Sequence, residues 1–210
     1  EGQAYTLIDT AGMRRRPRIT HSVEIYSVSR AVRALERSHV ALLVLDTTQE
    51  IADQDARIAT LIERRGRACV VVCNKWDVIE KDTGTMVAYE KDLRERLPFL
   101  AHAPMIFISA LTGRRVHKVM DTMKSAYASF NQWIGTGELN RWLEKVQIHR
   151  QPPVWRGKRL KIYFGAQVGV RPPTFALQVN SERAISEHYR RFLINRLRTD
   201  FGFEGAPIRL

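Results

Sequence analysis

Three short segments carry the side chains best suited to chemistry, and each follows an apolar run of four or five residues. They are Asp9-Thr10-Ala11-Gly12, Asn74-Lys75-Trp76-Asp77 and Ser109-Ala110-Leu111. Runs such as Cys69–Cys73 and Met105–Ile108 are typical of strands buried in a parallel sheet, and Tyr5–Ile8 is expected to be a third. Open α/β sheets bind ligands at the carboxyl ends of such strands. We therefore expect the three segments to meet at one edge of a sheet.

The second and third segments suit the recognition of guanine. An ionised Asp77 only accepts hydrogen bonds, and guanine presents two donors, N1–H and the exocyclic amine, where adenine presents neither. A buried acceptor without a donor costs about 1–3 kcal/mol, so this carboxylate would select GTP against ATP. Asn74 is expected to pin the neighbouring loops, and the stem of Lys75 to cover the flat face of the base. The turn Ser109-Ala110-Leu111 is expected to offer a backbone N–H to the guanine O6.

The first segment suits the phosphate end of the same nucleotide. Asp9 is expected to hold Mg²⁺ through a water molecule, and the N–H of Gly12 to approach the γ-phosphate because no Cβ intervenes. These two residues are the predicted catalytic pair, and Thr10 and Ala11 complete the GTP-binding loop. The alternative is that the three segments are unrelated turns, which their order and their shared position after apolar runs disfavour.

No G-x-x-x-x-G-K-[ST] stretch occurs in the 210 residues. That loop cradles the α- and β-phosphates with backbone N–H groups, and it supplies a lysine and a hydroxyl that binds Mg²⁺. The chain begins at Glu1-Gly2, shortly before Asp9, and we expect it to be a fragment of a longer protein. Alone, it is predicted neither to hydrolyse GTP measurably nor to bind it tightly.

Composition favours a soluble protein of the cytoplasm. No stretch approaches 18 uninterrupted apolar residues, so neither a membrane span nor a membrane partner is expected. The two cysteines, Cys69 and Cys73, lie four residues apart on one predicted strand. At that separation on an extended strand they are too distant to pair, and we expect reduced core residues.

Hydrophobic periodicity predicts an α/β alternation over residues 1–135. A buried strand is expected at Val40–Leu45. Helices are expected within residues 25–35, near residues 58–62, over Met86–Leu97 and from Val116 to about Trp133. The inward side chains of the last helix are expected to be Val119, Met120, Met123, Tyr127 and Phe130. The predicted fold class of this part is α/β, a truncated G domain of the phosphate-loop type with a mostly parallel sheet.

Two glycines in Ile134-Gly135-Thr136-Gly137 interrupt the helical pattern and mark the predicted boundary between domains 1–135 and 136–210. The second domain has the order α-β-β-α-β, typical of a small α+β module with its helices on one sheet face. Its strands are expected at Leu160–Val168, Thr174–Val179 and Pro207–Leu210. Its first helix is expected to carry the apolar residues Leu139, Trp142, Leu143 and Val146.

Positive charge is concentrated in residues 136–210, where 14 Lys/Arg stand against six Asp/Glu and give +8 of the chain's +12. Such a bias favours a polyanion, and RNA before a membrane surface. The RNA-binding candidates are Lys158, Arg159, Lys161, Arg190 and Arg191. The alternative is a solvated surface with internal ion pairs.

Sequence motifs in both domains resemble the Der (EngA) ribosome-biogenesis GTPases. They are Asp9–Arg16, Gln54-Asp55, Asn74–Asp77, Arg171–Phe175, Tyr189–Leu193 and Gly202–Ile208. The resemblance implies a parent protein with two tandem G domains, of which this chain holds most of the second, and a C-terminal KH-like domain. It implies GTP hydrolysis in the assembly of the large ribosomal subunit, with rRNA and the first G domain as partners. The implied cofactors are Mg²⁺ with GTP or GDP, and K⁺, because Met13 stands where Ras-like proteins place a water-orienting glutamine.

Two further expectations concern RNA. Gly202-Phe203-Glu204-Gly205 imitates the G-x-x-G loop of RNA-gripping KH domains, but it follows the last long helix and carries an acid, so a turn is expected. The arginines Arg14–Arg16 are expected in a nucleotide-sensitive loop. A non-catalytic ribosome-binding module with a scaffold G domain remains the alternative function. An Era-type or tRNA-modifying GTPase is disfavoured by the Arg171–Phe175 motif and the misplaced G-x-x-G.

Overall fold

The N-terminal half of the protein is built on a parallel sheet in the computed structural model, which describes residues 4–8, 31–80 and 82–210. The strands are β1 (Val40–Asp46), β2 (Ala68–Asn74) and β3 (Met105–Phe107), in the order β1-β2-β3. Asp46 lies opposite Asn74, and Cys73 lies opposite Phe107. The carboxyl ends of the three strands therefore form one edge.

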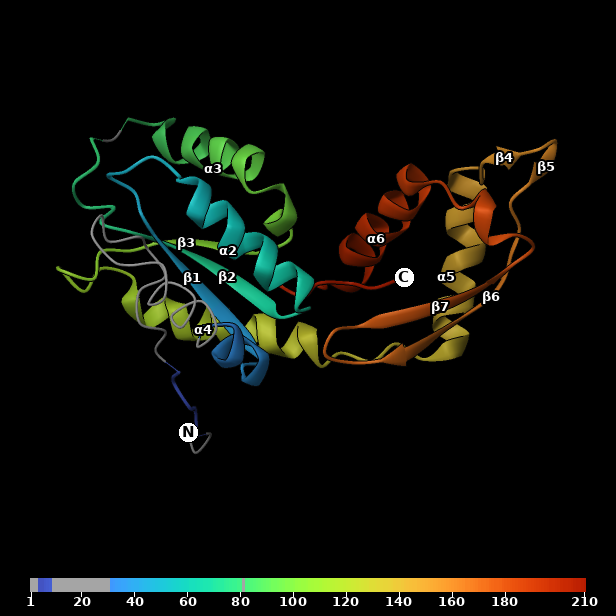
Figure 1. Ribbon diagram of the computed structural model, residues 1–210, viewed down its shortest axis with the longest axis horizontal. Coiled ribbons are helices and arrows are strands. Elements are labelled where there is room, and N and C mark those ends of the chain that lie inside the picture. Colours follow the sequence, from blue (N-terminus) through green and yellow to red (C-terminus); the bar gives the residue numbers. More distant parts are fainter. Residues whose placement is uncertain (1–3, 9–30, 81) are drawn as a thin grey trace, which may run out of the picture.

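Helices cover both faces of this sheet (Figure 1). On one face lie α2 (Asp53–Arg64), α3 (Thr85–Arg96) and the short 3-10 helix η1 (Pro98–Leu100). On the other face lies α4 (Val116–Phe130), which buries Ala126 and Phe130. Met120, expected inside, is 39% exposed, because the buried residues of α4 lie in its C-terminal half. Residues 31–37, before β1, are also helical.

The predicted strand at Tyr5–Ile8 is wrong. Residues 4–8 form no strand, and Leu7 is 87% exposed. A short apolar run becomes a strand only where a neighbour supplies hydrogen bonds along its edge, and β1 pairs only with β2 in the described chain. By contrast, β2 is buried as expected, and its cysteines Cys69 and Cys73 are free thiols with 0% exposure.

The C-terminal half is a small α+β domain. It contains α5 (Thr136–His149), the hairpin β4 (Val154–Trp155) and β5 (Lys158–Arg159), the antiparallel pair β6 (Ile162–Gly169) and β7 (Thr174–Val179), η2 (Glu182–Ala184) and α6 (Glu187–Phe201). The hairpin was not predicted, because two-residue strands leave no periodic signal. The predicted last strand is wrong: Arg209 makes one isolated bridge to Thr174, and Pro207 has no N–H to extend it.

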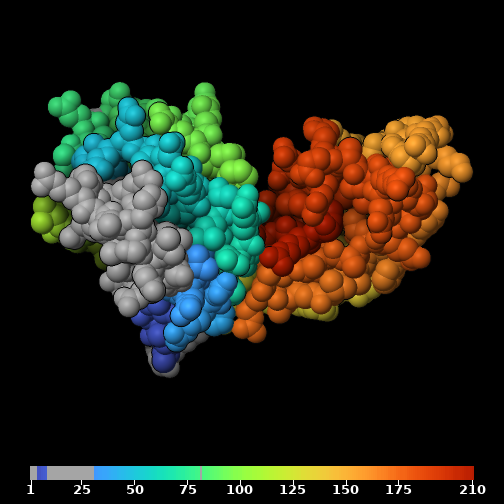
Figure 2. Space-filling model, viewed as in Figure 1, coloured from blue at the N-terminus to red at the C-terminus, as the bar shows by residue number. Residues whose placement is uncertain are grey.

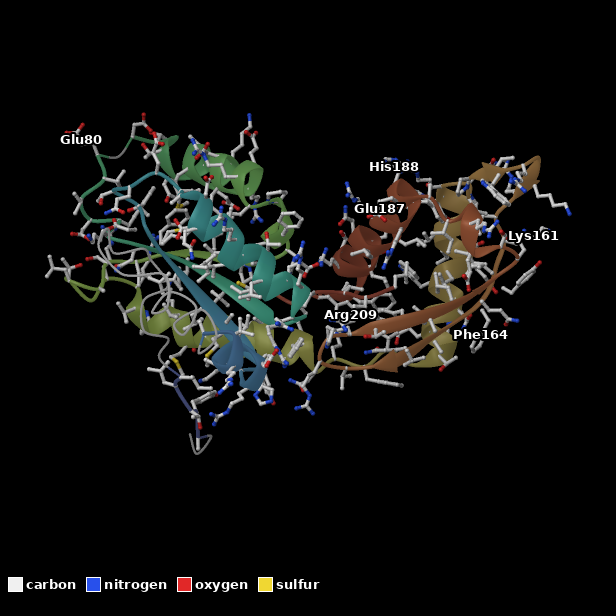
Figure 3. The ribbon with its side chains drawn as sticks, viewed as in Figure 1. Glu80, Lys161, Phe164, Glu187, His188 and Arg209 are labelled. Atoms are coloured by element: carbon white, nitrogen blue, oxygen red, sulfur yellow. The ribbon has the colours of Figure 1, made fainter. Side chains whose placement is uncertain are left out.

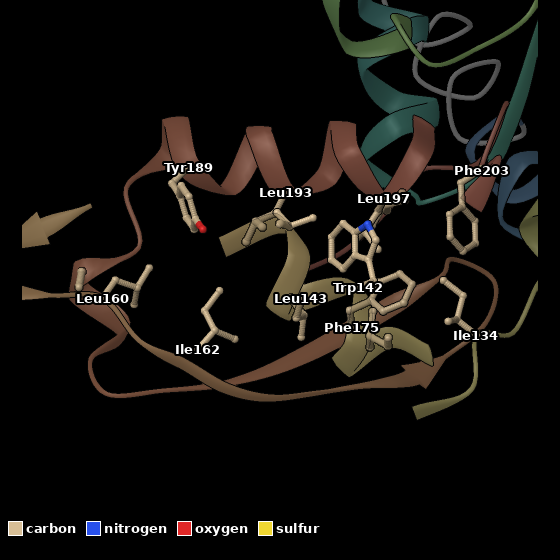
Figure 4. Packing of buried hydrophobic residues seen from close by; sticks show 14 residues of the cluster. Ile134, Trp142, Leu143, Leu160, Ile162, Phe175, Tyr189, Leu193, Leu197 and Phe203 are labelled. Carbon is tan, nitrogen blue, oxygen red and sulfur yellow. The ribbon is translucent and has the colours of Figure 1, made fainter. Parts of the chain in front are cut away.

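Both helices of this domain pack on the same face of the β6–β7 sheet (Figure 4). The core combines Trp142 and Leu143 of α5 with Leu193 and Leu197 of α6 and with Phe175 of β7. The side chain of Ser186 caps the start of α6 by accepting from the N–H of Tyr189, and Gly202 ends the helix in the left-handed conformation. These caps fix where α6 begins and ends.

The two halves meet at a narrow waist (Figure 2), which we call the junction. Gly205 donates its N–H to the carbonyl of His102 at 2.9 Å and accepts at 2.8 Å from the N–H of Cys69 in β2. Ser129 and Gln132, at the end of α4, donate to carbonyls of Gly202 and Phe201 at 3.1 and 2.9 Å. The segment Gly202–Gly205 is therefore a turn, as expected, and it docks on the N-terminal domain.

Candidate functional site

Asn74 ends β2 and holds the loops after all three parallel strands together. Its side-chain Oδ1 accepts a hydrogen bond from the backbone N–H of Ala110, beyond β3, at 2.9 Å. Its carbonyl oxygen accepts from the N–H and the hydroxyl of Thr47, beyond β1, at 3.0 and 2.9 Å. One residue thus couples three loops, which gives this edge of the sheet a defined shape before any ligand arrives.

Lys75, the next residue, is bound to the end of β1. Its ammonium lies 2.8 Å from Oδ2 of Asp46, and its backbone adopts a left-handed φ of 63°, which costs a non-glycine residue about 1–2 kcal/mol. The hydrogen bond from Lys75, followed by one from Thr48, lowers the pKa of Asp46 to about 2. Asp46 is therefore ionised at neutral pH and keeps the lysine against the strand ends.

Trp76 and Asp77 differ in burial. The Trp76 indole is 7% exposed and packs on Phe107, with 4.5 Å between ring centroids, while its backbone N–H donates to Ile108 at 3.0 Å. Asp77 is exposed. The buried ring anchors the segment, while the following residue, Asp77, stays exposed. Sequence reasoning gave Trp76 no role, although a large apolar residue between two charged ones was the available signal.

Most backbone N–H groups of the turn after β3 donate to acceptors within the protein. Ser109 is 1% exposed, and its hydroxyl accepts from the N–H of Thr112 at 3.1 Å. The N–H of Ala110 is bound to Asn74. Among the described residues, the N–H of Leu111 has no acceptor, and its side chain is 90% exposed. Leu111 is therefore the residue of this turn whose N–H is left for a ligand.

A cavity of about 250 Å³ adjoins the same edge. Asp77 and Ser109 line it together with Trp76, Phe107 and Arg114. Its lining combines aromatic surface with a carboxylate and a guanidinium, the mixture expected where a flat polar ring binds. The structure thus brings Asn74, Lys75, Asp77, Ser109, Ala110 and Leu111 to one edge of the sheet.

The predicted phosphate-binding residues lie outside the described part of the chain. They are Asp9, Thr10, Ala11 and Gly12, and Met13 and Arg14–Arg16 follow them. Within the described residues, no group of three His, Cys, Asp or Glu side chains could hold a metal ion. Mg²⁺ in nucleotide sites is usually bound by one or two carboxylates and by the phosphates themselves, so Asp9 remains the predicted ligand.

The two predicted basic clusters differ in their surroundings. Lys158, Arg159 and Lys161, which we call the hairpin cluster, are all exposed, and none forms an ion pair within the described chain. Arg159 does donate to the carbonyl of Pro152 at 3.0 Å. On α6, by contrast, Arg191 lies 3.2 Å and Arg190 4.0 Å from carboxylate oxygens of Glu187.

Comparisons with known proteins agree with this geometry. The family model of the elongation factor Tu GTP-binding domain matches residues 1–129. The model of the KH-domain-like C-terminal region of EngA bacterial GTPases matches residues 134–210. The chain belongs to the Der (EngA) GTPase family. Its G domain and its KH-like domain are those of that family, as the motifs predicted.

Individual Der proteins resemble the chain along its whole length. GTPase Der of Thermoanaerobacter pseudethanolicus is 45% identical over 99% of the chain, and GTPase Der of a Synechococcus species (strain JA-3-3Ab) is 47% identical over 100%. The matched regions are 47% and 46% of those proteins. The chain therefore spans about half the length of the curated relatives it matches.

A solved structure of Era with MgGDPNP and a segment of 16S ribosomal RNA covers 93% of the chain and 71% of its own length. It has 19% identity and a TM-score of 0.45. Among the described helices of this Der-family chain, none combines the length and apolar character needed to cross a bilayer.

Proposed function

We propose that this chain is the guanine-reading and RNA-binding part of a GTPase that assists assembly of the large ribosomal subunit in the cytoplasm. A GTP-binding role is supported by the match of residues 1–129 to the elongation factor Tu GTP-binding domain and of residues 134–210 to the KH-like domain of EngA GTPases. The observation that carries the proposal is the coupling of three strand-end loops by Asn74 beside an exposed Asp77. That arrangement suits a rigid pocket for one kind of base.

In this proposal each residue at the edge has a separate task. Asp77 accepts from the guanine N1–H and amine, and the N–H of Leu111 donates to O6, because Ala110 already serves Asn74. The stem of Lys75, whose end is held by Asp46, covers the flat face of the base. Asn74 positions these groups.

The phosphate end rests on residues outside the described ranges. Asp9 would hold Mg²⁺ through water, and the N–H of Gly12 would meet the γ-phosphate, with Thr10 and Ala11 shaping the loop. When bound, Mg²⁺ neutralises charge on the phosphates. K⁺ is the further expected cofactor. Without a phosphate loop, these 210 residues alone are expected to show neither tight GTP binding nor hydrolysis.

The KH-like domain supplies the proposed contact with rRNA. The hairpin cluster offers cations that no carboxylate of the described chain neutralises, so its charge is open to phosphates. Arg190 and Arg191 are weaker candidates because Glu187 already neutralises part of their charge. The first G domain of the parent protein is the other proposed partner. The alternative, a non-catalytic RNA-binding module, keeps the same RNA contact without hydrolysis.

The proposal that Asp77 recognises guanine is tested by replacing one oxygen of its carboxylate with an NH₂ group. In a chimera that places the phosphate-loop segment of a Der GTPase before residue 1, Asp77→Asn turns an acceptor into a donor. We expect GTP affinity to fall about 10- to 100-fold and XTP affinity to rise, since xanthine carries an acceptor where guanine carries its amine. Calorimetry with both nucleotides measures the change.

Glu80→Gln is the matched control, because it removes one exposed carboxylate from the same loop (Figure 3). It should leave both affinities unchanged. If Asp77→Asn also leaves the GTP-to-XTP preference unchanged, Asp77 does not read the base. A chimera that binds GTP with this selectivity but does not hydrolyse it would favour the non-catalytic alternative.

A further inference from the structure

The outer face of the β6–β7 sheet, away from α5 and α6, carries exposed aromatic residues. Phe164 lies opposite Gln178, and Ala166 lies opposite Ala176, so these four share the outer face. Phe164 is 45% exposed, and Tyr163, at an adjacent irregularity in the strand, is 61% exposed. Small side chains beside an exposed ring leave open space above the sheet.

This face is uncharged, but cations border it. Neither β6 nor β7 contains an Asp, Glu, Lys or Arg residue. Lys161 directly precedes β6, about 10 Å along the strand from Phe164, and both lie at the outer rim of the KH-like domain, away from the G domain (Figure 3). An exposed aromatic surface and exposed positive charge that is unpaired within the described chain therefore lie next to each other in one region of the domain.

Asn180 fixes the hairpin cluster relative to this face. Its side-chain amide donates to the carbonyl of Arg159 at 2.9 Å and accepts from the N–H of Lys161 at 3.0 Å. Its own backbone N–H donates to the carbonyl of Lys161 at 3.1 Å. Since Asn180 directly follows β7, these bonds tie the base of the hairpin to the sheet. The backbone that carries Arg159 and Lys161 is thus fixed next to the start of β6, the strand that carries Phe164.

We propose that this region binds unpaired RNA, with bases stacked on Phe164 and Tyr163 and phosphates on the hairpin cluster. The proposal rests on the rRNA contact of the proposed function and deepens it by naming single-stranded nucleotides as the ligand. Stacking on an aromatic ring suits any base, because every base has a π-face, and cations beside the ring follow the backbone. Paired bases hide their faces, so a duplex reaches only the cations. The region accordingly discriminates single strands from duplexes without reading sequence.

The test compares two RNA probes on the full 210-residue chain. A fluorescein-labelled 12-nucleotide oligoadenylate and a 12-base-pair RNA duplex are titrated with wild type and with Phe164→Leu and Tyr163→Leu variants, by fluorescence anisotropy. Leucine keeps apolar volume on the strand but removes the ring. Phe99→Leu is the matched control, since Phe99 is 53% exposed on the G domain.

We expect each ring removal to weaken oligoadenylate binding about 5- to 100-fold. Duplex affinity, the salt dependence and the Phe99→Leu variant should stay unchanged. Denaturant unfolding confirms that each variant is folded, and Phe164→Tyr, which restores an aromatic ring, should recover single-strand binding. Equal losses for both probes, or no loss in folded ring-removal variants, would overturn the proposal.

Two further measurements distinguish base stacking on this region from the proposed phosphate contact with rRNA. If ring removal changes nothing while neutralising the hairpin cluster weakens both probes, phosphate binding stands and base stacking fails. If neither change matters, the rRNA contact at this hairpin fails as well. Polyglutamate is added as a competitor, and tighter binding of polyglutamate than of oligoadenylate at equal charge concentration would overturn the proposal in favour of an acidic protein partner.

Discussion

Two regions of residues 136–210 place positive charge in different surroundings: the junction, and the exposed region around the hairpin cluster, which we call the hairpin surface. At the junction, burial lowers the pKa of Arg198 to about 10, and the charge of Glu63 on the facing G domain partly offsets it. Burial also raises the pKa of Glu63, despite the nearby charges of Arg198 and Arg209. At the hairpin surface, Lys158 and Lys161 are exposed and have no carboxylate partner in the described chain.

Basic residues of one domain can therefore have different physical roles. Charges at the junction are partly desolvated and lie near opposite charge on the G domain. They therefore contribute to the packing of the two domains against each other. Charges of the hairpin surface are solvated and open, so they are available to release counterions from a polyanion. Only the charges of the hairpin surface should contribute to the salt dependence of RNA binding.

The largest expected effect comes from breaking the junction at Gly205. This residue has a φ of +75°, and a Cβ there would lie 2.7 Å from the Cβ of Ala126 and 3.2 Å from the carbonyl of Cys69. Gly205→Ala should therefore lower the free energy of unfolding by about 3 kcal/mol, from overpacking and left-handed strain together. Guanidinium unfolding followed by tryptophan fluorescence measures it.

Gly202→Ala is the matched control. Gly202 has a φ of +76°, but a Cβ there would meet no atom of the described chain within 4 Å, so only the strain of about 1 kcal/mol should remain. Equal losses at the two glycines would mean that the turn is not tightly packed on β2, and the distinction between the junction and the hairpin surface would weaken.

A smaller effect is expected from acid, through His102. Burial, and then the charges of Arg198 and Arg94, lower the pKa of His102 to about 3 in the folded protein, against about 6.5 when unfolded. As pH falls below 6.5, the unfolded chain takes up the proton first, so stability is lost progressively down to pH 3. Between pH 7 and pH 5 this amounts to about 2 kcal/mol.

His102→Gln isolates this contribution, because other groups titrate equally in both proteins. The raised pKa of Glu63 acts in the opposite direction, and it cancels in the comparison. Urea unfolding at pH 7 and pH 5 should show wild type losing about 2 kcal/mol more than the variant. If both proteins lose the same stability, His102 is not buried in its neutral form at the junction.

Much of the fold follows from strong periodic signals. The continuous apolar run that forms β2 and the helical spacing of Leu139, Trp142, Leu143 and Val146 predicted buried elements that the structure contains. Tyr5–Ile8 failed because an apolar run does not reveal whether a neighbouring strand will pair with it. The hairpin β4–β5 was missed since its short strands are stabilised by contacts such as the bond from Leu160 to Pro153, at 2.8 Å.

At the candidate site, the meeting of three motif residues was predictable, but the part played by Trp76 and the internal bonds were not. Motif positions after strands indicated that Asn74, Asp77 and Ser109 would meet. That Asn74 uses the N–H of Ala110, which leaves Leu111 as donor, depends on tertiary geometry. Likewise, composition showed that Arg190 and the hairpin cluster are basic, but the pairing of Arg190 with Glu187 depends on where α6 begins.

The most direct test of the account is the salt dependence of rRNA binding in two matched variants. One replaces Lys158, Arg159 and Lys161 with glutamine, and the other replaces Arg190, Arg191 and Arg196, whose partners are Glu187 and Asp200. Filter binding of a large-subunit rRNA fragment is measured over a salt series. Each phosphate contact contributes about 0.7–0.9 to the slope of log affinity against log salt.

We expect the hairpin variant to lose about two units of slope and to weaken similarly on unrelated RNA sequences, while the α6 variant stays close to wild type. An unchanged slope in the hairpin variant, with a loss in the α6 variant or on neutralising Arg14–Arg16, would contradict the account and place the RNA contact elsewhere.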